Sequence, residues 1–322
     1  MRTPAHRLRS AFRVVRAIGA HPARALRVAY YASSDDGYSL GGYLRVRLSA
    51  GARRDAIAYL LSREDAGLVL SFDRGGVSWT VPAGDIVTTG LFRDGTFAGR
   101  EIAAVVAWLR AHGYPLDGRR VIDLGANVGS TTIPLARQGF RVLAVEPVPS
   151  TFAFLEENVR NNDPDQRITI LQRAVGRESE VFTIALTSHG SSHVVPESAD
   201  PGTGAQTIEV QAEAIPELLR LGGVGPHEEI AFVWSDTEGC EGYVVATGSV
   251  LWEKGVPLYA EIQPGALDQV IGVSTFLELV STSFRTFVGR RELVAQPESA
   301  AARPIGELRH ELDSLGDVLL LP

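Results

Sequence analysis

The sequence predicts a doubly wound α/β fold, with helices on both faces of a mostly parallel sheet, preceded by a smaller N-terminal region. Three observations predict it. From residue 119 onward, apolar runs of strand length alternate with segments of helical periodicity. The runs are continuously apolar, as at 142–145 (Val-Leu-Ala-Val), which is typical of strands covered on both faces. The first run leads into a glycine-rich turn at 125–129 that opens a helix.

Strands and helices are expected to alternate after residue 119. Strands are expected at 120–124, 141–145, 167–172, 230–235 and 257–262, with short closing strands at 284–288 and 317–321. Helices are expected at 129–138, 150–161, 243–252 and 266–280. Residues 185–206 are rich in Ser, Gly, His and Pro, which predicts a long loop over the sheet.

The N-terminal region is expected in two parts, residues 1–34 and 35–118, ahead of a main domain at 119–322. Leu8, Phe12 and Val15 recur at helical spacing, so residues 5–18 are expected as a basic amphipathic helix. Such a helix either packs its apolar stripe on the body or contacts a membrane surface or a partner. The second part is expected as a small β-rich cap. Its expected elements are a strand at 43–48, a hairpin of 68–72 and 77–81 around Gly75-Gly76, and a helix at 97–110.

Composition and charge exclude several classes of protein. The chain has 322 residues, of which 45% are hydrophobic, and no run approaches the ~20 apolar residues of a membrane span. Residues 1–34 hold seven Arg and no acid, so the net charge of −7 leaves −14 on residues 35–322. An acidic body is a poor partner for nucleic acid. The single cysteine, Cys240, forms no internal disulfide or multi-cysteine metal site, and a reduced, cytoplasmic setting is expected.

Two acids and a glycine turn predict a nucleotide-type cofactor site. Asp123 lies near the end of the first strand, and Gly125 and Gly129 allow the turn that follows it. Glu146 ends the next strand, 23 residues after Asp123, where a carboxylate can hold both ribose hydroxyls. The turn lacks the middle glycine of the pyrophosphate-binding motif, which argues against NAD.

These motifs together resemble the FkbM family of S-adenosylmethionine-dependent methyltransferases. The similarity rests on the run Asp123–Gly129 and on Glu146-Pro147, which Phe152, Leu155, Asn158 and Asn162 follow at helical spacing. It extends to Ala174-Val175-Gly176, to residues 236–241 (Asp-Thr-Glu-Gly-Cys-Glu), to Glu261 and to the closing residues 317–322. The resemblance covers about residues 119–322 and implies a Rossmann-like class I methyltransferase sheet.

The resemblance also implies roles for individual residues. Asp123, Gly125 and Gly129 would shape the pocket for the methionine part of the cofactor, and Asn127 lies in the same turn. Glu146 would bind the ribose, and the residues around Ala174 would border the adenine. Asp236 would face the sulfonium and the methyl acceptor.

The catalytic group is less well defined, because the sequence departs from the family at one position. Trp234 stands where the family usually has a Lys, and it is expected in the core or in the pocket wall. The candidate bases are His189, His193, Asp236, Glu238 and Glu261. Both histidines are alternatively solvated loop residues. Asp236, Glu238 and Glu261 could alternatively hold a divalent cation such as Mg²⁺, or hydrogen-bond the substrate directly.

The resemblance implies O-methylation of a hydroxyl on a sugar, glycoside or polyketide-type natural product, with S-adenosylmethionine as the methyl donor. The expected partner is a small-molecule or glycan acceptor rather than nucleic acid. Two alternatives stay open: a non-catalytic S-adenosylmethionine-binding module in a larger biosynthetic assembly, and a nucleotide-dependent enzyme of another class. Cys240 is expected as a small buried residue beside two glutamates rather than a reactive thiol.

Overall fold

The computed structural model describes residues 13–17, 68–163, 165–186, 192–195, 206–312 and 316–322. The described residues divide into two compact units. The smaller one holds residues 13–17, 68–97 and 160–162, and the larger one holds most of the rest. No helix in the described part of the chain is long and apolar enough to cross a membrane.

A three-stranded antiparallel sheet and one helix form the smaller unit. Strands β1 (Arg13–Ala17), β2 (Leu68–Arg74) and β3 (Val77–Pro82) are followed by α4 (Ile86–Asp94). The expected β2–β3 hairpin is confirmed: Arg74 pairs with Val77, and the two glycines between them have φ of +62° and +76°. Helix α4, which the sequence analysis did not single out, begins where Asp85 accepts a hydrogen bond from the Val87 amide.

The N-terminal expectations need one correction. Residues 13–17 form strand β1, which pairs antiparallel with β2, and not the end of an amphipathic helix. Two adjacent β-branched residues, Val14 and Val15, favour the extended backbone once a strand edge supplies hydrogen bonds. The rest of the expected helix over 5–18 and the expected strand at 43–48 lie outside the described residues.

The larger unit is a doubly wound α/β fold, which confirms the predicted class. Its main sheet has the order β14-β13-β15-β12-β11-β4-β5-β6. Strands β4, β5, β6, β11 and β12 are parallel, and β15 runs antiparallel between β12 and β13. The strands span Arg120–Leu124 (β4), Arg141–Val145 (β5), Ile168–Leu171 (β6), Ile230–Ser235 (β11), Leu258–Ala260 (β12), Thr286–Gly289 (β13), Arg303–Pro304 (β14) and Val318–Leu321 (β15). The chain leaves β4 toward β5 on one side and later returns to β11 on the other, so the sheet switches direction between β4 and β11.

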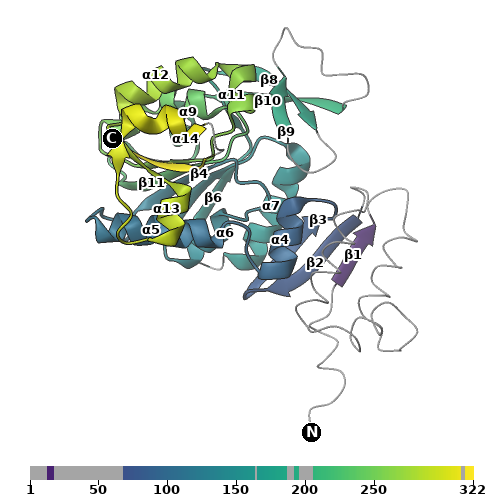
Figure 1. The fold of residues 1–322 in the computed structure, drawn as a ribbon. Coiled ribbons are helices and arrows are strands. Elements are labelled where there is room, and N and C mark those ends of the chain that lie inside the picture. Colours follow the sequence, from purple (N-terminus) through teal and green to yellow (C-terminus); the bar gives the residue numbers. More distant parts are fainter. Residues whose placement is uncertain (1–12, 18–67, 164, 187–191, 196–205, 313–315) are drawn as a thin grey trace. The chain divides into compact units, whose positions relative to one another are not determined.

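Helices cover both faces of this sheet. Figure 1 shows α5, α6 and α13 on one side and α9, α12 and α14 on the other. The first group spans Gly99–Ala111 (α5), Thr132–Arg137 (α6) and Arg290–Ala295 (α13), and α7 spans Pro149–Asn162. The others span Ile215–Leu221 (α8), Glu241–Thr247 (α9), Ser249–Trp252 (α10), Pro264–Val270 (α11), Val273–Ser283 (α12) and Leu308–Leu312 (α14). A short 3₁₀ turn, Ile305–Glu307, precedes α14.

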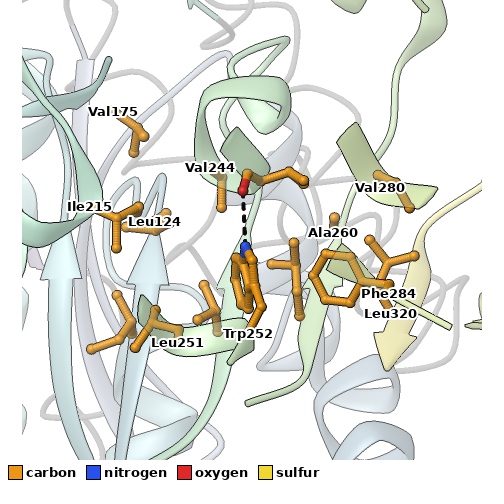
Figure 2. Packing of buried hydrophobic residues seen from close by; sticks show 14 of the residues in the cluster. Leu124, Val175, Ile215, Val244, Leu251, Trp252, Ala260, Val280, Phe284 and Leu320 are labelled. Atoms are coloured by element: carbon orange, nitrogen blue, oxygen red, sulfur yellow. Dashed lines mark hydrogen bonds between the residues drawn. The ribbon is translucent and has the colours of Figure 1, made fainter. Parts of the chain in front are cut away.

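The core on the second face is built from alternate strand residues and the helices above them. Figure 2 shows Trp252 among these side chains, where its indole Nε1 donates to the Val245 carbonyl at 2.9 Å. The Trp252 ring lies 5.0 Å from the ring of Phe284. Because the indole N–H has a partner, the whole side chain is buried without an unsatisfied donor.

A second, four-stranded sheet corrects the expectation of a long loop at 185–206. Its order is β7-β10-β8-β9, from Ala174–Val175 (β7), Glu180–Leu186 (β8), Ser192–Val195 (β9) and Gln206–Glu213 (β10). The adjacent valines of β9 pair antiparallel with β8. Residues 187–191 and 196–205 lie outside the description.

Helix boundaries differ most where glycine or a turn interrupts the pattern. The helix expected at 266–280 is two helices, α11 and α12, separated at Gly272, whose φ is +83°. The helix expected at 243–252 divides likewise at Gly248 into α9 and α10. The expected three-part domain division stays a prediction, although α5 packs its Ile102 and Trp108 into the core of the larger unit.

Candidate active site

One row of residues adjoins the ends of neighbouring strands: four of them follow the last residue of a strand, and Asp317 precedes the first residue of β15. Leu124 pairs with Val145 and Ser235, Ser235 pairs with Ala260, and Ala260 pairs with Val318. The adjoining residues therefore form a row across β5, β4, β11, β12 and β15: Glu146, Gly125, Asp236, Glu261 and Asp317. Backbone bonds of 2.9 Å from the Asp236 amide to Leu124 and from the Glu261 amide to Ser235 extend the ladder to this row. The row lies at the carboxyl edge, across the point where the sheet switches direction.

Gly125 lets β4 and β11 approach each other closely. A Cβ at Gly125 would lie 1.8 Å from the Asp236 carbonyl oxygen, and the φ of Gly125 is +83°. Gly129 (φ +92°) is packed instead against Ile133 and Leu155. Asn127 adopts φ +51° and its side-chain oxygen accepts from the Val128 amide at 2.7 Å. Gly125 and Gly129, which the sequence analysis takes as a sign of close ligand approach, therefore also allow close packing within the chain itself.

Asp123 is fully buried, and only one of its two carboxyl oxygens has a hydrogen-bond partner in the structure. Its Oδ2 accepts a short hydrogen bond from the Thr132 hydroxyl, whereas its Oδ1 has no partner in the structure. Burial raises the pKa of Asp123 to about 7, and the Thr132 hydrogen bond opposes the rise. A buried oxygen without a partner is costly unless another group binds it, so Oδ1 is a natural acceptor for a ligand.

Glu146 is held by two backbone amides. Its Oε2 accepts from the Asn127 amide at 3.0 Å, and its Oε1 accepts from the Val148 amide at 2.9 Å. Burial raises its pKa to about 7 against these two bonds, and the nearby Asp123 raises it further. Each carboxylate oxygen can accept more than one hydrogen bond, so both retain capacity for a hydroxyl donor. The ribose contact of Glu146 stays a prediction, and the two amide bonds leave acceptor capacity on its carboxylate for that contact.

The three acids that the sequence analysis proposed for catalysis lie together. Asp236 and Glu261 follow the paired residues Ser235 and Ala260, so they are neighbours at the ends of β11 and β12. Burial, then the charges of Glu261, Glu238 and Glu241, hold the pKa of Asp236 well above its ordinary range. The pKa of Glu238 is also raised, first by burial and then by Glu261. Gln263 donates to Glu261 at 3.1 Å and so satisfies part of its carboxylate.

Glu241, the first residue of α9, holds the loop between β11 and α9 in place. Its carboxylate accepts from the amide and hydroxyl of Thr237, each at 2.8 Å, and from the Gly239 amide at 3.0 Å. Burial raises its pKa to about 7, although these three bonds oppose the rise. It thereby fixes the backbone that carries Asp236 and Glu238.

Sequence reasoning missed one group at this edge. The Tyr259 hydroxyl donates to Asp317 Oδ2 at 3.1 Å, and Arg290 Nε lies 3.3 Å from the same oxygen. Burial, then the charge of Glu261, raises the pKa of Asp317 to about 6. The sequence does show that Asp317 directly precedes a closing strand. Its neighbours in space depend on the pairing of β12 with β15, which local sequence patterns do not predict.

The remaining candidates are placed as follows. Ala174 is buried beside Val148 and Cys240 in the core of the small sheet, so it lies near the turn that follows Glu146. Cys240 is buried, and burial raises the pKa of its thiol, which agrees with a small unreactive core residue. Trp234 is buried and its ring lies 4.2 Å from that of Tyr259, so it is a core residue. His193 belongs to β9, opposite Ala185. His189 lies outside the described residues.

The expected Mg²⁺ site receives no support from the geometry. Within the described ranges, no group of three or more His, Cys, Asp or Glu side chains is arranged to hold a metal ion. A cavity of about 1020 Å³ lies elsewhere, and it is lined by Arg119 just before β4, by Ile230 at the start of β11 and by Val256 just before β12. It is therefore at the amino edge of the sheet, opposite to the carboxyl row.

The sheet and its carboxyl edge define a class of protein. A Rossmann-like sheet with an antiparallel strand near one edge, a glycine turn after β4 and an acid after β5 is the class I methyltransferase architecture. Residues 123–278 match the family model of the Methyltransferase FkbM domain, which supports a methyltransferase of the S-adenosylmethionine-dependent type. The resemblance seen in the sequence is thereby confirmed.

Relatives among curated proteins are methyltransferases. An uncharacterized methyltransferase of Mycobacterium bovis is 28% identical over 158 residues, which are 48% of this chain and 53% of that protein. The cypemycin N-terminal methyltransferase of a Streptomyces species is 41% identical over 61 residues, 19% of this chain and 24% of that one. The chain thus spans about half the length of the mycobacterial relative.

Solved structures with a similar arrangement include two ligand complexes. The O-methyltransferase of Bacillus cereus in complex with SAH has a TM-score of 0.38 at 13% identity, covering 69% of this chain and 79% of that one. TYW2 of P. horikoshii in complex with MeSAdo has a TM-score of 0.40 at 14% identity, covering 87% of this chain and 83% of that one.

Proposed function

We propose that this chain transfers a methyl group from S-adenosylmethionine to a hydroxyl of a sugar, glycoside or polyketide-type natural product. The observation that carries the proposal is the row at the carboxyl edge. Glu146 lies at one end of it, and the neighbouring acids Asp236 and Glu261 lie on the other side of Gly125. A cofactor acid and an acceptor acid pair thus flank the turn where the sheet switches direction.

The residues present fit the cofactor. Asp123 Oδ1 is a buried acceptor without a partner, and Glu146 retains acceptor capacity on both oxygens. In the proposed complex Glu146 holds the ribose hydroxyls, and Asp123 lies below the turn that receives the methionine part. S-adenosylmethionine supplies the methyl group from a cationic sulfonium. Ala174 and Val148 give an apolar wall near the ribose site, which suits an adenine ring.

The protein's part in the reaction is alignment and proton removal. The acceptor oxygen loses its proton as the new carbon–oxygen bond forms, and a base within hydrogen-bond reach assists this step. Asp236 is the proposed base, because burial and the charge of the neighbouring Glu261 raise its pKa well above the ordinary range and make it a stronger proton acceptor. Glu238 and His193 are the further candidate contacts to the acceptor. Several carboxyl acceptors at one edge suit a molecule with more than one hydroxyl. We place this reaction in natural product biosynthesis in the cytoplasm.

One observation favours a second function. Trp234 stands where the family usually has a Lys, and it is packed in the core against Tyr259. A chain without that Lys could bind S-adenosylmethionine as a non-catalytic module of a larger biosynthetic assembly. That alternative gives cofactor binding without turnover on any acceptor.

The test is a calorimetric titration of S-adenosylmethionine, and separately of NAD, into the purified protein. We expect micromolar binding of S-adenosylmethionine only, lost in Glu146→Ala and kept in Glu253→Ala, a matched change at the opposite edge. A hydroxylated acceptor panel with labelled methyl donor then separates the two functions. Product that disappears in Asp236→Asn supports the transferase. Binding with no product across the panel supports the module, and a folded protein that does not bind S-adenosylmethionine contradicts both.

A further inference from the structure

We propose that Asn158 is a positioning residue for the cofactor site. By holding the Val128 carbonyl it fixes the turn at 125–129, and the Asn127 amide of that turn orients Glu146. The inference rests on the proposed function, since Glu146 is the residue proposed to bind the ribose. It adds a group on α7 that contacts neither cofactor nor acceptor in the scheme above.

Asn158 lies on the face of α7 that is turned to the glycine turn. Leu155 and Asn158 are the two buried residues of this helix, and they lie three apart on one face of it. Leu155 packs at the turn itself, because a Cβ at Gly129 would lie 3.2 Å from Leu155 Cδ1. Asn158 is fully buried on the same face, where a polar side chain is costly unless it is hydrogen-bonded.

The side-chain amide of Asn158 donates to the backbone of the turn. Its Nδ2 donates to the Val128 carbonyl at 2.8 Å. Val128 is itself buried, and a buried carbonyl needs a hydrogen-bond partner. The helix that follows Glu146 thus supplies a donor to the turn that follows β4.

The turn needs such support because its backbone is strained. Asn127 has a φ of +51°, in the left-handed region that a residue other than glycine adopts at a cost. Glu146 Oε2 accepts from the Asn127 amide at 3.0 Å, and Asn127 Oδ1 accepts from the Val128 amide at 2.7 Å. A strained conformation persists only where the surrounding contacts fix it. With Asn158 on the Val128 carbonyl, three side chains hold three backbone groups of residues 127 and 128.

The same bonds tie Asn158 to the orientation of Glu146. The Asn127 amide is one of the two donors that hold the Glu146 carboxylate, and the Val148 amide is the other, at 2.9 Å. Without the Asn158 donor the strained turn can relax and carry the Asn127 amide away from Oε2. Glu146 then keeps one of these two donors, and its carboxylate is no longer held in a single orientation for a ligand.

The first measurement is amide hydrogen exchange, which needs no cofactor. Asn158→Ala should speed exchange at the Asn127 and Val128 amides about tenfold relative to the amides of β5, because local opening becomes easier. Val280→Ala, at a buried position of α12, is the control for lost stability and should not speed these two amides selectively. Asn158→Ser, whose hydroxyl bonds within its own helix, gives the same test where the alanine variant is too unstable.

The second measurement is the calorimetric affinity for S-adenosylmethionine. Asn158→Ala should weaken binding about threefold to tenfold, the effect of one lost hydrogen bond. Adding Asn158→Ala to Glu146→Gln should weaken binding no further, because the single oxygen of Gln cannot accept from both amides and the orientation is already lost. Asn161→Ala, at an exposed position of the same helix, is the matched control and should leave the affinity unchanged.

The coupling between the two positions distinguishes positioning from a merely structural role. A structural role lowers thermal stability, and its effect on affinity is the same with and without Glu146→Gln. Unchanged exchange at Asn127 in a folded Asn158 variant, or effects on affinity that multiply in the double variant, would overturn the inference. If exchange quickens as expected while the natural chain does not bind S-adenosylmethionine, the proposed function fails and the role of Asn158 in holding the turn stands.

Discussion

At the scale of single residues, Gly125 is the position where a side chain has no room. An alanine Cβ would meet the Asp236 carbonyl at 1.8 Å, and the backbone would keep φ +83°. We expect Gly125→Ala to destabilise the protein by about 4 kcal/mol or more, since a backbone clash adds to about 1–2 kcal/mol of left-handed strain. Gly118→Ala has a similar φ of +74° but open space, and should cost only the strain. Urea unfolding measures both, and equal losses would contradict the close approach of β4 and β11.

Glu146 gives a second prediction at this scale, on the pH dependence of cofactor binding. Its pKa of about 7 means that it is partly protonated near neutrality. Because the ionised carboxylate accepts hydroxyl hydrogen bonds more strongly, affinity for S-adenosylmethionine should rise about threefold to tenfold from pH 6 to pH 8. Glu146→Gln should bind weakly and lose this dependence. Calorimetry across the range tests it, and a pH dependence that persists in Glu146→Gln would assign it to another group.

At the scale of elements, the loop between β11 and α9 depends on one side chain. Glu241→Ala removes the acceptor of three hydrogen bonds from Thr237 and Gly239. We expect a loss of about 1–3 kcal/mol in the free energy of unfolding, because buried donors are left without partners. Methyl transfer should fall more than cofactor binding, since the loop carries Asp236 and Glu238. Glu217→Ala, which removes an exposed pair with Arg220, should change little. Equal effects on binding and transfer would argue against this role.

Some strands could be predicted from the sequence and others could not. The strands at 120–124, 141–145 and 230–235 were predicted to the residue, because fully buried parallel strands read as unbroken apolar runs. The small sheet is missed because β9 lies within a polar stretch and β10 follows it, and because their pairing with β8 depends on contacts that no local pattern gives.

The residues of the candidate site also differ in whether the sequence alone could predict them. The sequence predicts Asp123 and Glu146 from their places at strand ends, which a local pattern gives, and it predicts Asp236 from the family resemblance. Asp317 is not predicted, because its opposition to Glu261 depends on the register of β15 against β12. Register is fixed by the burial of whole strands and not by the residue before one of them.

At the scale of the whole molecule, titrating acids determine how stability depends on pH. Among the described residues the pKa of one carboxyl, Glu217, is lowered, and seven are raised. The raised ones are Asp85, Asp123, Glu146, Asp236, Glu238, Glu241 and Asp317. A raised native pKa means that the folded protein binds more protons than the unfolded chain between about pH 4 and pH 7.

The sign of the effect follows from this proton count. Unfolding releases protons in that range, so the free energy of unfolding should fall as the pH rises from about 4 to 7, by at most about 1.4 kcal/mol per pH unit for each carboxyl. The net charge of −7 at pH 7 adds repulsion in the same direction. Urea unfolding at pH 5, 6 and 7 measures the slope, which Glu146→Gln and Glu241→Gln should each reduce and Glu253→Gln should leave unchanged. A protein whose stability rises over this range would show that its buried carboxyls are ionised and paired in solution.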